Sequence, residues 1–258
     1  IKMSAVSLTF GDVAENHKGM QKIGTLSQHG FNLKDLNVFK EWFEEKGCKC
    51  NIIKLHWLLD ISLQNENRAY ILVVKKAVNA LLNDENGDNA LLEEQNELKK
   101  DTKSYMYGRV VNKHARHNLC FGETHQEAIY EEGKGTVYAF DELNYLKQIR
   151  EKLGEIHPRK CRDLQAEGNY YYDTSKCGIG FHGDSERKKV LAIRLGNTIP
   201  LCYTWYHNNQ NISDILTINS LEHGDMYIMS ERTTGYNWKC KSKYTLRHSA
   251  GCKKYTSI

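Results

Sequence analysis

Short apolar runs alternate with polar residues through the first part of the chain. Residues 5–10, 51–55 and 69–74 are apolar stretches of strand length, bounded by polar or glycine positions. Residues 77–82 then return to a helical pattern. The pattern predicts an α/β unit over residues 1 to about 83.

One segment between these strands has a clear helical period. After Gly30, apolar side chains recur at helical spacing with Lys and Glu between them, and Gly47 supplies a stop signal. The apolar positions are Leu33, Leu36, Phe39, Trp42 and Phe43. Residues 83–89 are polar and acidic, and 91–100 read as an exposed helix, so we expect a boundary between two parts of the protein here.

From about Tyr105 the chain reads as short strands around one helix. Asp141 is the expected N-cap of that helix, and Gly154 marks its C-terminal end. Its apolar side contains Leu143, Leu146, Ile149 and Leu153. The expected strands are 164–166, 169–172, 190–194, 201–206, 215–218, 225–229 and 244–248.

Short strands at this spacing are typical of a double-sheet barrel or jelly roll. We therefore predict an α+β protein in which residues 101–258 form a double-stranded β-helix (jelly roll) domain. Residues 1–100 would be an N-terminal α/β extension of unknown role.

Composition narrows the class of protein. A hydrophobic fraction of 40% over 258 residues supports a substantial core. No apolar run reaches the length of about 18 residues that a membrane helix needs, and the N-terminus does not resemble a signal peptide. We expect an intracellular protein, cytoplasmic or nuclear, with no membrane partner.

The eight cysteines and the net charge narrow the class of protein only slightly. The cysteines are scattered rather than dense, and Cys48 and Cys50 are too close together for a zinc-finger pair, so we expect free thiols. A net charge of +4 permits an anionic partner without requiring one.

Candidate chemistry is concentrated in one stretch, Gly178-Ile179-Gly180-Phe181-His182-Gly183-Asp184-Ser185-Glu186. If His182 and Asp184 lie on one strand, both side chains point to the same face and can bind one ion. Two histidines and one carboxylate are a known ligand set for iron(II). His182 and Asp184 are therefore candidate catalytic and metal-binding residues.

The third ligand has three candidates downstream, His207, His223 and His248. His207 stands at the end of an expected strand and His223 in a turn, where solvent-exposed histidines are common. His248 lies inside the last expected strand, which in a jelly roll runs beside the strand of His182. We predict His248 as the third ligand.

An ordered set of motifs resembles the AlkB-like iron(II)/2-oxoglutarate dioxygenases over about residues 105–258. The set is Asn169-Tyr170-Tyr171, His182-Gly183-Asp184, Arg194-Leu195-Gly196, and Gly224-Asp225 before an apolar strand that ends in Met229. The ordered set of four motifs is a more specific signal than any single motif in it.

The resemblance implies a role for each residue. His182, Asp184 and His248 would hold Fe(II), and Asn169 and Tyr171 would hydrogen-bond the co-substrate 2-oxoglutarate. Molecular oxygen would be the oxidant, and 2-oxoglutarate would become succinate and CO2. A cation must hold the co-substrate carboxylate, and Arg194, Arg247 and Lys254 are the candidates.

Basic and aromatic residues suggest the substrate. Lysine and arginine can contact phosphates while aromatic rings stack on an unpaired base. The candidate substrate-binding residues are Arg116, Arg187, Lys188, Trp238 and Lys241. The alternative interpretation is that such lysine-rich loops only solvate the rim.

The predicted function is an oxygenase that hydroxylates or oxidatively demethylates a modified nucleobase in DNA or RNA. One alternative keeps the chemistry but acts on a protein side chain or a small molecule. A second alternative is a non-catalytic nucleic-acid or protein-binding module whose metal site has decayed.

Overall fold

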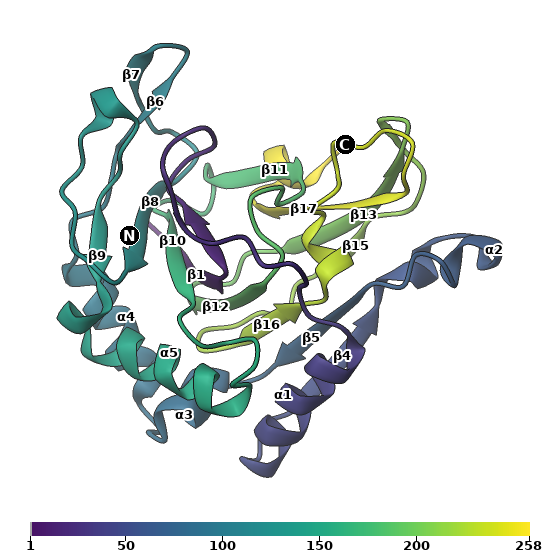
Figure 1. The fold of residues 1–258 in the computed structure, drawn as a ribbon, viewed down its shortest axis with the longest axis horizontal. Helices are drawn as coiled ribbons and strands as arrows, with labels where there is room; N and C mark the ends of the chain where they lie inside the picture. Colours follow the sequence, from purple (N-terminus) through teal and green to yellow (C-terminus); the bar gives the residue numbers. More distant parts are fainter. Residues whose placement is uncertain (1) are drawn as a thin grey trace.

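The computed structural model describes residues 2–258 and contains a mixed α+β protein dominated by β-sheets. The main sheet curls like half a barrel, with α1, α3, α4 and α5 on its outer side (Figure 1). Its strand order is β4-β5-β16-β12-β1-β10-β8-β9, and within residues 2–258 only β8 and β9 of this sheet pair in parallel. The bounds are β1 (Ala5–Gly11), β4 (Cys50–Lys54), β5 (Tyr70–Val74), β8 (His117–Gly122), β9 (Val137–Ala139), β10 (Gln165–Tyr171), β12 (Val190–Gly196) and β16 (Met226–Met229).

A smaller sheet faces the concave side of the main sheet (Figure 1). Its order is β11-β17-β13-β14, and β15 also pairs with β13. These strands are β11 (Gly178–His182), β13 (Leu201–His207), β14 (Gln210–Asn211), β15 (Leu216–Ile218) and β17 (Thr245–Gly251). Two separate hairpins accompany the sheets, one of β2 (Val13–Glu15) with β3 (Lys22–Gly24) and one of β6 (Lys103–Met106) with β7 (Arg109–Asn112).

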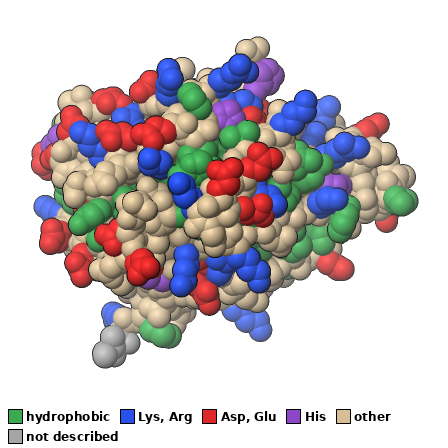
Figure 2. Space-filling model, turned by 90° about the horizontal axis from the view of Figure 1, so that it is seen from below, with side chains coloured by type: hydrophobic (Ala, Val, Ile, Leu, Met, Phe, Trp, Pro, Cys, Tyr) green, Lys and Arg blue, Asp and Glu red, His purple; other side chains and the backbone are tan. Residues whose placement is uncertain are grey.

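Four helices cover the convex face of the main sheet (Figure 1). They are α1 (Leu33–Glu45), α3 (Ala77–Leu82), α4 (Gly87–Glu97) and α5 (Asn144–Ile156), and the shorter α2 (Ile61–Gln64) and α6 (Lys253–Thr256) lie elsewhere. On the face seen from below, Lys and Arg side chains are intermixed with Asp and Glu (Figure 2). None of the helices in residues 2–258 is long and apolar enough to cross a membrane.

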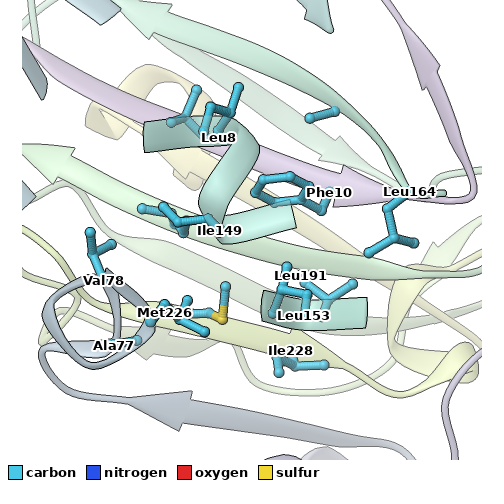
Figure 3. Close-up of a cluster of buried hydrophobic side chains, with 14 of the residues drawn as sticks. Leu8, Phe10, Ala77, Val78, Ile149, Leu153, Leu164, Leu191, Met226 and Ile228 are labelled. Carbon is cyan, nitrogen blue, oxygen red and sulfur yellow. The ribbon is translucent and has the colours of Figure 1, made fainter. Parts of the chain in front are cut away.

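Strand alternation divides the buried residues between two cores. Leu8 and Phe10 of β1 and Met226 and Ile228 of β16 point outward and pack under α3 and α5 (Figure 3). Their neighbours Tyr227 and Met229 point inward and pack with the smaller sheet, which contributes the buried Tyr203 and Trp205. Along β1 and β10 the inward positions are instead polar, and they line a cavity.

The N-terminal segment contributes strands to the main sheet. β1 pairs with β10 on one side and β12 on the other, while β5 pairs with β16. The main sheet therefore contains strands from both sides of the predicted boundary near residue 100. The division into an N-terminal extension and a catalytic domain stays a prediction.

Most predicted elements are confirmed, and three details differ. The helix expected to be exposed over residues 91–100 is α4, which begins at Gly87 and fully buries Leu91 and Gln95. Asp141 is not the N-cap of α5, because it lies in a short 3₁₀ turn and the helix begins at Asn144. The expected strands 164–166 and 169–172 are one continuous strand, β10, because Gly168 continues the pairing with both β1 and β8. All eight cysteines are free thiols, as predicted.

Candidate metal centre and its cavity

Three side chains on the smaller sheet converge on one point. His182 ends β11, Asp184 follows it, and His248 lies opposite His182 in β17. Nε2 of His182 lies 3.3 Å from Oδ1 of Asp184, and Nε2 of His248 lies 3.6 Å from the same oxygen. One ligand atom from each residue lies within 4.8 Å of the others, so the three can hold a metal ion. The predicted grouping of His248 with His182 and Asp184 is confirmed.

The hydrogen bonding of His182 orients its ring. Nδ1 of His182 lies 2.8 Å from the carbonyl oxygen of Gly180, which can only accept, so Nδ1 donates there. Nε2 faces Oδ1 of Asp184 over 3.3 Å. At this position Nε2 can donate a hydrogen bond to Asp184 or, without a proton, bind a metal ion.

The protonation states of the other two residues also suit a metal. Burial and repulsion from His182 lower the pKa of His248 to about 3, so its ring is neutral at neutral pH. Burial alone would raise the pKa of Asp184, but Arg187 and the two histidines outweigh it and hold that pKa below its usual range. His248 and Asp184 therefore offer a neutral imidazole and a carboxylate to a metal ion.

The local geometry differs from the strand that we expected. β11 stops at His182, and a register irregularity precedes it, so Asp184 lies just beyond the strand. The backbone N–H of Asp184 donates to the carbonyl oxygen of Thr234 over 2.8 Å, which fixes the position of Asp184. Glycine is required at position 183, between His182 and Asp184, because a Cβ there would lie 2.1 Å from the carbonyl oxygen of Gly235.

The two other candidate histidines have different neighbours. The ring of His207 stacks on Tyr244 with centroids 4.3 Å apart. Nδ1 of His223 accepts the backbone N–H of Gly196 over 3.0 Å. Neither belongs to the group that could hold a metal.

A cavity of about 1030 Å³ opens beside the three side chains, all of which line it. Asn169 and Tyr171, both predicted to bind the co-substrate, also line it from β10. Oδ1 of Asn169 accepts from Nε of Arg116 over 2.9 Å and from Nδ2 of Asn118 over 2.7 Å. With its oxygen occupied, Asn169 has its NH₂ group free to donate.

Arg194 is the predicted carboxylate-binding cation that lines the cavity. It is 3% exposed, and Nη1 donates to the carbonyl oxygen of Ile199 over 2.9 Å. Its Nε has no hydrogen-bond partner among residues 2–258, and neither does the buried hydroxyl of Tyr203. Buried donors without partners are rare, and they suggest a missing acceptor.

The other two predicted cations lie outside the cavity lining. The guanidinium of Arg247 stacks 3.9 Å from the ring of Tyr206 and 5.1 Å from that of Trp238. Lys254 lies exposed on α6 beside Tyr255. Because Arg247 and Lys254 do not line the cavity, Arg194 is the favoured partner for the carboxylate.

Some of the predicted substrate-binding residues line the cavity and others lie outside it. Arg116 and Trp238 line the cavity. Lys188 lies outside the lining and donates to the carbonyl oxygen of Gln28 over 2.7 Å. Lys241 is exposed and also lies outside the lining.

Arg187 also lines the cavity, but its charge is already paired. It is 4% exposed and forms ion pairs with Glu167 and with Glu186. Its sequence position among lysines suggested a surface residue, whereas it is buried beside Glu167. Its predicted contact with a phosphate stays a prediction.

Several cavity residues were missed by the sequence analysis. Glu15, His17 and Lys18 reach the cavity from the segment that follows β1, and Glu167 reaches it from β10. Burial raises the pKa of Glu167 to about 7 although Arg187 lowers it. Only the position of Glu167 two residues before Asn169, hence on the same strand face, could have identified it.

The fold and the site define a mixed α+β protein with a candidate two-histidine, one-carboxylate centre. No protein-family model matches the chain. The chain is 45% identical over 251 residues to uncharacterized protein R156 of Acanthamoeba polyphaga mimivirus, covering 97% of this chain and 96% of the relative. The chain therefore belongs to the same family as R156.

Proposed function

We propose that this protein is an AlkB-like iron(II)/2-oxoglutarate dioxygenase that hydroxylates or demethylates a modified nucleobase in DNA or RNA. The observation that carries the proposal is the convergence of His182, Asp184 and His248 beside the cavity. Three protein ligands on one side of an iron ion leave the other side open for a co-substrate and oxygen.

The architecture supports the same class. The main and smaller sheets pack face to face through a shared apolar core, as the sheets of a double-stranded β-helix do. The first two ligands come from the edge strand β11 and its end, and the third comes from its neighbour β17. We interpret the two sheets as a double-stranded β-helix that includes β1.

The residues present fit the metal and the co-substrate. His182, Asp184 and His248 would hold iron(II), and Arg194, with its unpartnered Nε, would pair with a carboxylate of 2-oxoglutarate. Asn169 and Tyr171 would donate hydrogen bonds to the same molecule. When bound, iron with 2-oxoglutarate and oxygen supplies oxidation of a substrate C–H bond to C–OH, with succinate and CO2 as the other products.

The protein's own residues keep the site ordered. Arg116 and Asn118 both donate to the side-chain oxygen of Asn169, so its orientation is fixed and its NH₂ group is left to donate to a ligand. The inward aromatic and apolar residues, Tyr227 and Met229 among them, exclude water from that wall.

Charge and aromatic character around the cavity support a nucleic-acid substrate. Lys18, Lys22 and Lys239 are exposed cavity-lining cations, and Trp238 lies among them. Nζ of Lys18 lies 5.6 Å and Nζ of Lys239 6.0 Å from the centre of the Trp238 ring. Lysines beside a partly exposed ring can contact phosphates while the ring stacks on a base.

The first experiment is anaerobic titration of the protein with iron(II) and 2-oxoglutarate, followed by the visible charge-transfer band. The wild type should show the band and His182→Ala should not. If the wild type shows no band, the oxygenase proposal is wrong and the non-catalytic binding module is favoured.

The second experiment identifies the substrate. The protein is incubated with a mixture of modified DNA and RNA, and nucleosides and succinate are measured by mass spectrometry. We expect loss of one modified nucleoside and a matching gain of succinate. If nucleic acid neither binds in a salt-dependent way nor stimulates succinate formation, the substrate is a protein side chain or a small molecule instead.

A further inference from the structure

The two oxygens of Asp184 face different partners. Oδ1 lies near Nε2 of both histidines, at 3.3 Å and 3.6 Å. Oδ2 lies 3.5 Å from Nε of Arg187. The carboxylate is therefore oriented with one oxygen toward the candidate metal position and the other toward the guanidinium.

Arg187 is itself held in place by two further carboxylates. Nη2 of Arg187 pairs with Oε1 of Glu167 and lies 2.9 Å from Oε1 of Glu186. Glu167 is fixed in turn, because its Oε2 accepts the backbone N–H of Glu15 over 3.1 Å. Nε of Arg187 has no hydrogen-bond partner within residues 2–258, so this N–H remains free for Asp184.

We propose that Arg187 is a positioning residue that keeps Oδ2 of Asp184 away from the metal, so that Asp184 binds through Oδ1 alone. The inference rests on the metal centre of the proposed function. A planar guanidinium suits this task, because it can contact Asp184 and Glu167 at once in a fixed geometry. A carboxylate that binds through one oxygen leaves a coordination position free for the co-substrate.

The test measures binding of Co(II) to the purified protein of residues 1–258 by titration, without an activity assay. We expect Arg187→Met to weaken Co(II) binding by about 10–100-fold, the effect typical of losing a group that orients a ligand. We expect Arg187→Lys, which retains the charge but not the planar fork, to weaken it less. Addition of 2-oxoglutarate should change the visible spectrum of bound Co(II) in the wild type and less in either variant.

Through-space electrostatics alone predicts the opposite sign. Removing a positive charge should strengthen the binding of a divalent cation, and Arg187→Lys should then match the wild type. The matched control is Lys22→Met, which removes a cation that lines the same cavity and pairs with Glu15 but with none of the three ligands. Its Co(II) affinity should be unchanged or higher.

The outcomes separate this inference from the proposed function. If the wild type binds Co(II) and both Arg187 variants bind it as tightly or more tightly, the positioning role is overturned while the metal centre stands. If the wild type fails to bind Co(II), the metal centre fails and the positioning role fails with it. If Arg187→Met does not fold, Arg187→Lys decides the question.

Discussion

His182 and His248 lie directly opposite each other on neighbouring antiparallel strands, with ring centroids 4.5 Å apart. The strand register therefore brings together two histidines that are far apart in the sequence. Asp184 is added by the short segment that follows β11.

The register predicts that His248 is a metal ligand. His248→Ala should weaken metal binding by more than about 100-fold, since loss of a direct ligand costs more than loss of an orienting group. Titration with Co(II) measures this. His223→Ala is the control, because His223 is engaged with Gly196 instead, and equal affinity in the wild type and His248→Ala would exclude His248 as a ligand.

Arg194 is predicted to bind the co-substrate rather than the metal. Arg194→Met should weaken 2-oxoglutarate binding about 10–100-fold, the range for a charge-assisted hydrogen bond, with metal affinity unchanged. Titration of 2-oxoglutarate into the metal-loaded protein checks this. Lys254→Met, on the exposed α6, should behave like the wild type, and a weakened Lys254 variant would reverse the assignment.

The exposed cations at the cavity are predicted to contact phosphates. Lys18→Met and Lys239→Met should each reduce the slope of log affinity against log salt by about 1 for single-stranded nucleic acid. Fluorescence anisotropy over a salt series measures the slope. The control is Lys40→Met, because Lys40 lies on the outer helix α1 and pairs with Glu44; this change should leave the slope unchanged. Equal effects at all three positions would mean that nucleic acid does not bind specifically at the cavity.

The central position of β1 predicts that the C-terminal part does not fold alone. Leu8 is fully buried in the helix-covered core, so Leu8→Ala should lower the free energy of unfolding by about 2–5 kcal/mol. Val38→Ala, at an exposed position of α1, should change it by less than about 0.5 kcal/mol.

A fragment of residues 101–258 should show no cooperative unfolding, and a stable fragment would confirm the domain division instead.

Lys113 predicts a pH dependence of stability. Burial and repulsion from Arg116 lower its pKa to about 7, so above that pH the folded state binds fewer protons than the unfolded state. Stability should therefore rise from about pH 7 towards the ordinary lysine pKa, by at most about 1.4 kcal/mol per pH unit from this residue. Urea unfolding of the wild type and Lys113→Met across this range should show the smaller slope in the variant, and identical slopes would contradict the lowered pKa of Lys113.

Local pattern was sufficient for the strands and for most of the candidate metal centre. The apolar runs identified β1, β12 and β16, and the position of His248 inside a strand placed it with His182 and Asp184. These features depend on neighbours in the sequence or on one strand pairing.

The rest depended on contacts between distant segments. Arg187 precedes two lysines, and the neighbouring sequence gives no indication that it pairs with the buried Glu167. Glu15 and Lys18 reach the cavity only because β1 inserts between β10 and β12. Pairing across such separations has no local sequence signal, so these residues were not predicted.

The place of β1 in the sheet also determines when the site can form during synthesis. β1 is synthesised before both of its partners, β10 and β12, which lie beyond residue 164. This apolar strand must therefore stay unpaired until both partner strands have been synthesised. Folding should be slow, since it depends on closing long loops, and the newly made β1 should need protection from aggregation until β12 is available.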